Sequence, residues 1–249
     1  MKYLVPLLFM LITGPALAQQ DFLSNQEYKH CMQLTRINPE QAFEKALGWQ
    51  DMGGGLPARH CAAVALISLE QYVQAAERLE VLAKDMPDDA PAGIVSDLLG
   101  QAGIAWHQAE DLDKAFATLS AALKLSPNHP VLLTDRAAVL VDGGKMWEAV
   151  DDLNTAIETN PYDTGALLFR GSAYRQLKSY DLALQDLNRV LELDSDNGEA
   201  LFERGVVYRL TQKPDLARAD WLKLIELHEG RPIADLARRN LEKLDLKAE

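Results

Sequence analysis

The stretch TGALLFRGSAYRQLKSYDLALQDLNRVLELDSDN, residues 164–197, decides the fold because its pattern recurs along the chain at regular intervals of its own length. Small residues occupy one recurring position, and alanines occupy another position further along each period. The small residues are Gly103, Ala137, Gly171 and Gly205, and the alanines are Ala115, Ala149, Ala183 and Ala217. Internal repetition at a period of this size is typical of solenoids and other repeat architectures.

Each period predicts two helices joined by a short turn. The small residue lets the first helix approach its antiparallel partner closely, and Ala and Leu residues three or four apart on the second helix form the facing apolar stripe. Loops such as SPNHP at residue 126 and NPYDT at residue 160 end the second helix. A hairpin of this size cannot bury its apolar face alone, so we expect the hairpins to stack.

With this pattern the chain resembles the tetratricopeptide repeat family. The segments of the chain that match a repeat of this family are residues 96–129, 130–163, 164–197 and 198–231. Residues 164–197 match the family pattern at seven positions and carry Ser195 where proline is usual. The matching residues are Leu167, Gly171, Tyr174, Tyr180, Ala183, Leu187 and Val190. The resemblance implies an all-α fold, a right-handed superhelical α-solenoid whose first helices line a concave groove.

The remaining segments fit the pattern less closely. Residues 23–55 and 56–89 read as two degenerate repeats, so residues 19–95 form an N-terminal region that precedes the regular array. The six residues from Ala90 to Val95 interrupt the period, and His30 stands where a regular repeat has Gly or Ala. Residues 232–249 contain one amphipathic helix, which we expect to cap the last repeat because an open-ended stack needs a polar outer face.

Residues 1–18 predict a secretory signal peptide. One lysine precedes an apolar run, and Ala16-Leu17-Ala18 has the small-x-small pattern of a cleavage site. We therefore expect an exported protein, periplasmic or alternatively secreted, without stable membrane insertion after cleavage. The formal net charge of −12 makes the chain a poor general binder of nucleic acid or anionic lipid.

The two cysteines, Cys31 and Cys61, raise three alternatives. The family resemblance places both on first helices of neighbouring repeats, so the thiols can face one seam, and an exported chain then favours a disulfide. A zinc site would add His30 and His60, but neighbouring residues on a helix point about 100° apart and rarely converge on one tetrahedral ion. A redox dithiol would favour closely spaced cysteines in a C-x-x-C motif.

Motifs for catalysis are missing from the sequence. It contains no H-E-x-x-H, G-x-S-x-G, S-x-x-K or phosphate-binding loop motif, and the glycines at 53–55 are better explained as a turn. We therefore predict a protein that is not an enzyme and that needs no cofactor and no metal.

A second pattern concerns charged residues. Arginines recur at 136, 170 and 204, and the same three repeats carry aspartates at 152, 186 and 220. The pairing of these residue types predicts ion pairs between helices, within or between repeats, with a structural role.

The resemblance implies a binding groove on the first helices. The carboxylate clamp of chaperone-binding relatives needs Lys and Asn, and the corresponding positions here include Thr134, Leu168 and Phe202, so binding of chaperone tails is not implied. The predicted groove residues are His107, Leu168, Arg175, Gln176, Phe202 and Arg209.

Arginines and apolar side chains together suit an extended segment that carries acidic and apolar residues. The alternative is that Arg175 and Arg209 pair internally with Asp142, Glu199 or other acids. We therefore predict a non-catalytic scaffold or adaptor that binds a protein or peptide partner. The alternatives are an accessory subunit of an envelope enzyme or assembly complex, and an assembly factor that acts through self-association.

Overall fold

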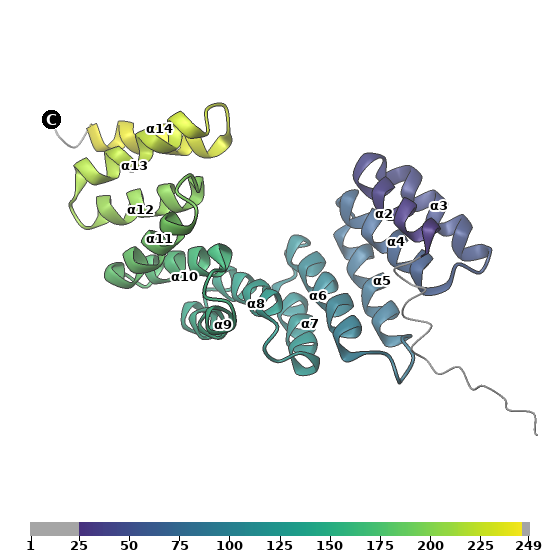
Figure 1. Cartoon of the computed structure of the whole chain (residues 1–249). Coiled ribbons are helices and arrows are strands. Elements are labelled where there is room, and N and C mark those ends of the chain that lie inside the picture. The colour runs from purple at the N-terminus through teal and green to yellow at the C-terminus, as the bar shows by residue number, and fades with distance from the viewer. Residues whose placement is uncertain (1–24, 246–249) are drawn as a thin grey trace, which may run out of the picture. The chain divides into compact units, whose positions relative to one another are not determined.

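A computed structural model describes residues 25–245, which form thirteen helices and no strand (Figure 1). The predicted signal peptide, residues 1–18, lies outside the described residues, as do residues 246–249. The chain divides into two compact units, and the division falls between Ala105 and Trp106 inside one helix. The sequence places the start of the regular array earlier, at residue 96.

The first unit is built from successive antiparallel helices and ends within α6. Its helices are α2 (Gln26–Ile37), α3 (Pro39–Asp51), α4 (Gly55–Ser68), α5 (Tyr72–Lys84) and the first part of α6 (Ala92–Gln108). The core between α4, α5 and α6 includes Ala63, Leu79, Leu82 and Leu98, which are buried. The apolar spacing predicted from the sequence thus forms a packed interior in this unit.

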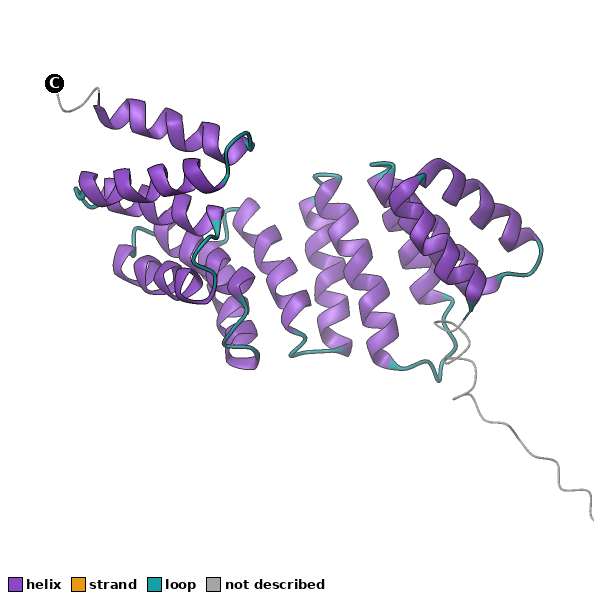
Figure 2. Ribbon diagram, turned by 45° about the horizontal axis from the view of Figure 1, so that its top comes forward, coloured by secondary structure: helices purple, strands orange, loops and turns teal. Residues whose placement is uncertain are grey.

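The second unit contains the regular hairpins, drawn as paired helices in Figure 2. Each first helix in the hairpins from residue 130 to residue 227 has 13 residues and each second helix has 14. The helices are α7 (Leu112–Leu125), α8 (Pro130–Asp142), α9 (Met146–Thr159), α10 (Thr164–Gln176), α11 (Tyr180–Leu193), α12 (Gly198–Leu210), α13 (Pro214–Leu227) and α14 (Pro232–Asp245).

Side-chain caps begin the first helices at the repeat interval. Asp163 and Asn197 accept hydrogen bonds from the backbone N–H groups of Ala166 and Ala200, and His129 does the same for Leu132. An N-terminal cap satisfies a backbone donor that has no partner within the helix. These caps explain why α8, α10 and α12 begin where they do.

Each first helix is followed by a residue with left-handed backbone conformation. Glu110, Gly144, Lys178 and Gln212 have φ between 58° and 73° and follow one another at the repeat interval. Only Gly144 belongs to the residue type that adopts this conformation without steric cost. The tight turn between the helices of a hairpin therefore imposes backbone strain on the other three residues.

The small residues of the repeat allow close approach, as the sequence predicts. A Cβ atom on Gly171 would lie 3.1 Å from Cγ of Leu187, and one on Gly205 would lie 2.8 Å from Cδ1 of Trp221. Real Cβ contacts are essentially never as short as the second distance. The first and second helices of these hairpins consequently pack with little space between their backbones.

The last helix, α14, covers the end of the array. Its buried Ala234 and Ala237 pack in one cluster with Trp221 and Leu224 of α13. Arg238 lies on its more polar side and pairs with Asp235 of the same helix at 2.6 Å. Residues 232–245 thus form a helix that packs on α13, and its role as a cap stays a prediction.

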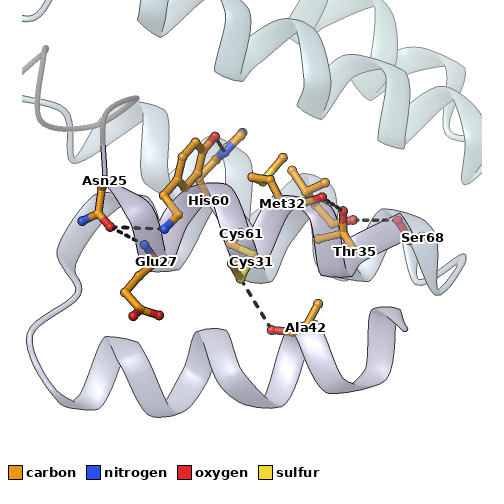
Figure 3. The surroundings of a disulfide bond; sticks show 11 residues. Asn25, Glu27, Cys31, Met32, Thr35, Ala42, His60, Cys61 and Ser68 are labelled. Carbon is orange, nitrogen blue, oxygen red and sulfur yellow. Dashed lines mark hydrogen bonds between the residues drawn. A yellow bond between two sulfur atoms is a disulfide. The ribbon is translucent and has the colours of Figure 1, made fainter. Parts of the chain in front are cut away.

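A disulfide joins Cys31 of α2 to Cys61 of α4, the pairing that the sequence predicts (Figure 3). The two Cα atoms lie 6.2 Å apart, within the usual range for a disulfide. Both sulfur atoms lie in a small cluster with Ala46 and Ala62, which are buried. No helix among the described residues is long and apolar enough to cross a membrane.

Replacing both Cys31 and Cys61 by alanine should destabilise the first unit by about 3–4 kcal/mol, because the bond closes a loop of about 30 residues and restricts the unfolded chain. Chemical denaturation followed by circular dichroism measures the change. Equal stability of the wild type and the double variant, with the wild-type material shown by peptide mapping to be oxidised, would contradict this prediction.

Candidate functional site

A ladder of arginines holds the hairpins of the second unit together. The Arg170 guanidinium donates from Nε and Nη2 to Asp186 at 2.8 and 2.7 Å, and from Nη1 to the Asn154 side chain at 2.9 Å. Asp186 belongs to the same hairpin and Asn154 to the preceding one. The same contacts recur for Arg136 with Asp152 and Ser120, and for Arg204 with Asp220 and Asn188.

The burial of the ladder determines its energetic role. The side chain of Asp186 is only 4% exposed, and the hydrogen bonds that it accepts hold the pKa of Arg170 above its usual range. Removing one member of a buried pair leaves a desolvated charge, which costs far more than an exposed pair contributes. The predicted ion pairs are therefore present, both within hairpins and in contact with the preceding hairpin.

Arg170→Leu should lower the free energy of unfolding by about 3 kcal/mol, because Asp186 would stay buried without its partner. Urea unfolding measures the loss, and the double variant Arg170→Leu/Asp186→Leu should lose less. Arg189→Leu is the control: Arg189 lies on the exposed side of α11, where it pairs with Glu192, so its loss should stay within about 0.5 kcal/mol. Unchanged stability of Arg170→Leu would make the ladder a binding feature instead.

The first helices of the second unit form one continuous face, which we call the first-helix face and define by α8, α10 and α12. α8 contacts α10, and α10 contacts α12. On these helices the predicted groove residues Leu168, Arg175, Phe202 and Arg209 are half-buried, and Gln176 is exposed. The ring of Phe169, next to Leu168, is 41% exposed.

Two of the predicted groove residues that can carry positive charge have internal partners. Arg175 on α10 forms a bidentate ion pair with Glu203 on α12. His107, at the end of α6, is half-buried and lies 2.6 Å from a carboxylate oxygen of Asp142. The alternative of internal pairing therefore describes Arg175, although its acid is Glu203 rather than either of the acids named from the sequence.

Arg209 differs from these two residues. Its Nε atom is buried and has no hydrogen-bond partner, and it forms no ion pair within the described residues. Such atoms are rare in folded proteins because an unsatisfied donor costs free energy. The Nε atom itself is covered, but the half-buried Arg209 guanidinium has no internal ion pair to break when a carboxylate from outside contacts its uncovered part.

Two further polar groups lie on this face. Thr134 is named in the sequence only as a clamp position without the required Lys or Asn, and Asp135 escaped notice. Thr134 Oγ1 and Asp135 Oδ2 on α8 are buried without a hydrogen-bond partner. A signal for Asp135 exists in the repeat, since Asp135, Phe169 and Glu203 share one position in successive repeats. Aligning the repeats therefore shows that Asp135 is an acid at a position where the next repeat has an aromatic residue.

Burial raises the pKa of Asp135 to about 6, against the opposing influence of His107 and His129. A carboxyl group with such a pKa could serve as a general acid or base. However, its Oδ2 atom is covered by protein, so a substrate cannot reach it. We therefore assign Asp135 a structural and electrostatic effect rather than a catalytic one.

Asp135→Asn should stabilise the protein at pH 7 by about 1–2 kcal/mol. The folded carboxyl keeps its proton up to about pH 6, whereas the ordinary pKa is 3.8. Stability from this group therefore falls as pH rises between these values, and the advantage of the Asn variant should vanish near pH 4. Thermal unfolding across pH 4–7 tests this, with the exposed Glu158→Gln as control. A difference between wild type and Asp135→Asn that is constant over this range would contradict it.

In the first unit, His60 has a structural environment. It is buried, its Nδ1 lies 2.8 Å from the Tyr28 hydroxyl, and its Nε2 lies 3.0 Å from the Gln101 side-chain oxygen. Burial lowers the pKa of His60, which keeps the ring neutral. His30, the other histidine of the zinc alternative, is exposed on α2. With both cysteines joined and both His60 nitrogens bonded, these residues form a packed core.

Known proteins match part of this chain in its repeat region. Residues 171–211 match the family model described as TPR repeat. Human tetratricopeptide repeat protein 16 is 37% identical over 82 residues, a match that covers 28% of this chain and 9% of that protein. Human tetratricopeptide repeat protein 13 is 30% identical over 128 residues, covering 49% of this chain and 14% of that protein. The match thus spans only a small part of these much longer relatives.

Solved structures share the fold at low sequence identity. The Cut9 and Hcn1 hetero-tetramer structure has a TM-score of 0.68 at 18% identity, covering 92% of this chain and 45% of that one. MamA from Desulfovibrio magneticus RS-1 has a TM-score of 0.62 at 20% identity, covering 71% and 97%. YrrB, described as a TPR protein with an unusual peptide-binding site, has a TM-score of 0.56 at 22% identity, covering 80% and 98%. These likenesses confirm an all-α solenoid.

Proposed function

We propose that this chain of tetratricopeptide repeats is an exported, non-catalytic scaffold that binds a protein partner, or an extended segment of one, on its first-helix face. The bound segment carries an acidic residue that pairs with Arg209 and apolar residues that contact Leu168, Phe169 and Phe202. The family resemblance and the solenoid fold support binding rather than catalysis, because stacked hairpins present extended surfaces.

The single observation that carries this proposal is the contrast among the cations of the face. Arg175 already holds Glu203, whereas the half-buried Arg209 guanidinium forms no ion pair within the described residues. A carboxylate that reaches the uncovered part of this guanidinium gains a charge-assisted hydrogen bond without displacing an internal one. The exposed ring of Phe169 and the half-buried Leu168 and Phe202 supply apolar contact on the same pair of helices.

Two of the structural neighbours are consistent with this role. YrrB is described as having a peptide-binding site, and Cut9 was solved in a complex with Hcn1.

Export, to the periplasm or as a secreted protein, is part of the proposal. The Cys31–Cys61 disulfide supports it because such bonds persist in oxidising compartments. N-terminal sequencing of native material should give Gln19 as the first residue, and a first residue within 1–18 would contradict export by cleavage after Ala18.

Crosslinking with mass spectrometry in the native envelope identifies the partner, and Arg209→Glu then tests the site. Affinity should fall at least tenfold, about 1.4 kcal/mol, because the partner's carboxylate would meet another negative charge. The matched control Arg189→Glu makes the same charge change on the second helix α11 and should leave affinity unchanged.

Phe202→Ala tests the apolar half of the site in the same assay, with melting temperatures measured for every variant. The proposal is wrong if folded Arg209→Glu and Phe202→Ala both bind the partner as tightly as the wild type. In that case the partner binds another surface of the chain.

A further inference from the structure

A hollow interrupts the surface of the second unit. It is lined by residues from α7, α8 and the start of α9, and it comprises two adjoining depressions of about 310 and 150 Å³. Both share Phe116, Leu140 and Lys145. We call this region the Leu140 hollow.

The repeat explains why the hollow exists. The position of Leu140 is aromatic in the other three regular repeats, where it is Trp106, Tyr174 and Tyr208. In the two following repeats, the guanidinium groups of Arg170 and Arg204 lie over these tyrosine rings at 5.9 and 5.8 Å. Leu140 is the one residue at this position without a ring, so the space that a tyrosine ring occupies elsewhere is left open.

A second departure widens the hollow. Gly143 lines it, whereas the later repeats carry Leu177 and Thr211 at the same position. The missing ring is partly compensated from α7, because the guanidinium of Arg136 lies over Phe116 at 5.7 Å. Phe116 itself remains 36% exposed, so an apolar aromatic wall faces the opening.

The rim of the hollow is mainly acidic. Asp113, Glu148 and Asp151 line it, are exposed and form no ion pair within the described residues, whereas Asp152 is bound to Arg136. The one exposed cation among the residues that line it, Lys145, places its ammonium over the Phe116 ring at 5.2 Å. The unpaired charge at the opening is therefore negative, which favours a positively charged ligand.

We propose that the Leu140 hollow is a second docking site, which binds an aromatic side chain flanked by basic residues in a protein partner. The incoming ring takes the place of the absent tyrosine and packs against Phe116, while the flanking cations pair with Glu148 and Asp151. Aromatic pairs of this kind favour edge-to-face or offset packing. None of the residues that line this hollow belongs to the site proposed above at Leu168, Phe202 and Arg209, so the two proposals stand independently.

The direct test fills the hollow with a larger side chain of the protein itself and measures the effect on ligand binding. The probe is a blocked pentapeptide with a central tryptophan flanked by lysines, titrated into the ¹⁵N-labelled protein and followed by NMR. Wild-type amide signals of Phe116, Leu140 and Lys145 should shift with saturation. Leu140→Tyr restores the repeat residue and should weaken peptide binding at least tenfold while the melting temperature is kept or raised. Gly143→Thr is a second filling variant should the first prove unstable.

The controls separate ring recognition from charge. A peptide with alanine for tryptophan should bind at least tenfold more weakly, and so should a peptide with glutamates for lysines. Glu148→Lys/Asp151→Lys should weaken the basic peptide tenfold, whereas Glu192→Lys on α11 should not. Leu182→Tyr adds a ring to α11 outside the hollow and should leave binding unchanged.

Three results would overturn the proposal. The first is equal binding of the tryptophan and alanine peptides. The second is wild-type affinity in both folded filling variants. The third is self-association of the wild type, measured by analytical ultracentrifugation, that Leu140→Tyr abolishes, since the occupant would then be a second copy of this chain. If Arg209 proves to have no role in partner binding, the outcome of these peptide measurements still decides the proposal for the Leu140 hollow.

Discussion

The half-buried guanidinium of Arg170 is the contact on which the geometry of the second unit depends. It bonds Asp186, 16 residues later, and Asn154, 16 residues earlier, so both spacings must be kept in every repeat that uses it. An insertion between these positions would leave a desolvated charge without a partner. The six-residue interruption of the period, Ala90 to Val95, lies before the ladder begins at Arg136, where it breaks no such contact.

Both candidate surfaces arise where one repeat departs from its neighbours on this constant framework. Arg209 lacks the acid partner that Arg175 has in Glu203, and Leu140 lacks the ring that Tyr174 and Tyr208 supply. At both places the changed side chain leaves an unpaired group or an open space. In a regular array, candidate binding surfaces are therefore found at the positions where one repeat differs from the others.

The helical hairpins could be predicted from the sequence because two closely packed helices need a small residue at the same position of every repeat, as Gly171 and Gly205 show. The ion pairs of the Arg170–Asp186 type could be predicted from the same constant spacing of arginines and aspartates. The partner of Arg175 did not, because several acids lie within reach on neighbouring first helices and only the packed structure selects Glu203. The burial of Asp135 was equally hidden, since exposure depends on the side chains of other helices. The proposed export concerns residues outside the described part of the chain.

The ladder also ends in a defined way at α14. Arg238 stands one full repeat period after Arg204, yet Leu222 occupies the place of Asn188, and Arg238 turns to Asp235 on its own helix. With Leu222 in place of a polar acceptor, α14 is held against α13 by the apolar packing of Ala234 and Ala237 on Trp221 and Leu224 and not by a further rung of the ladder.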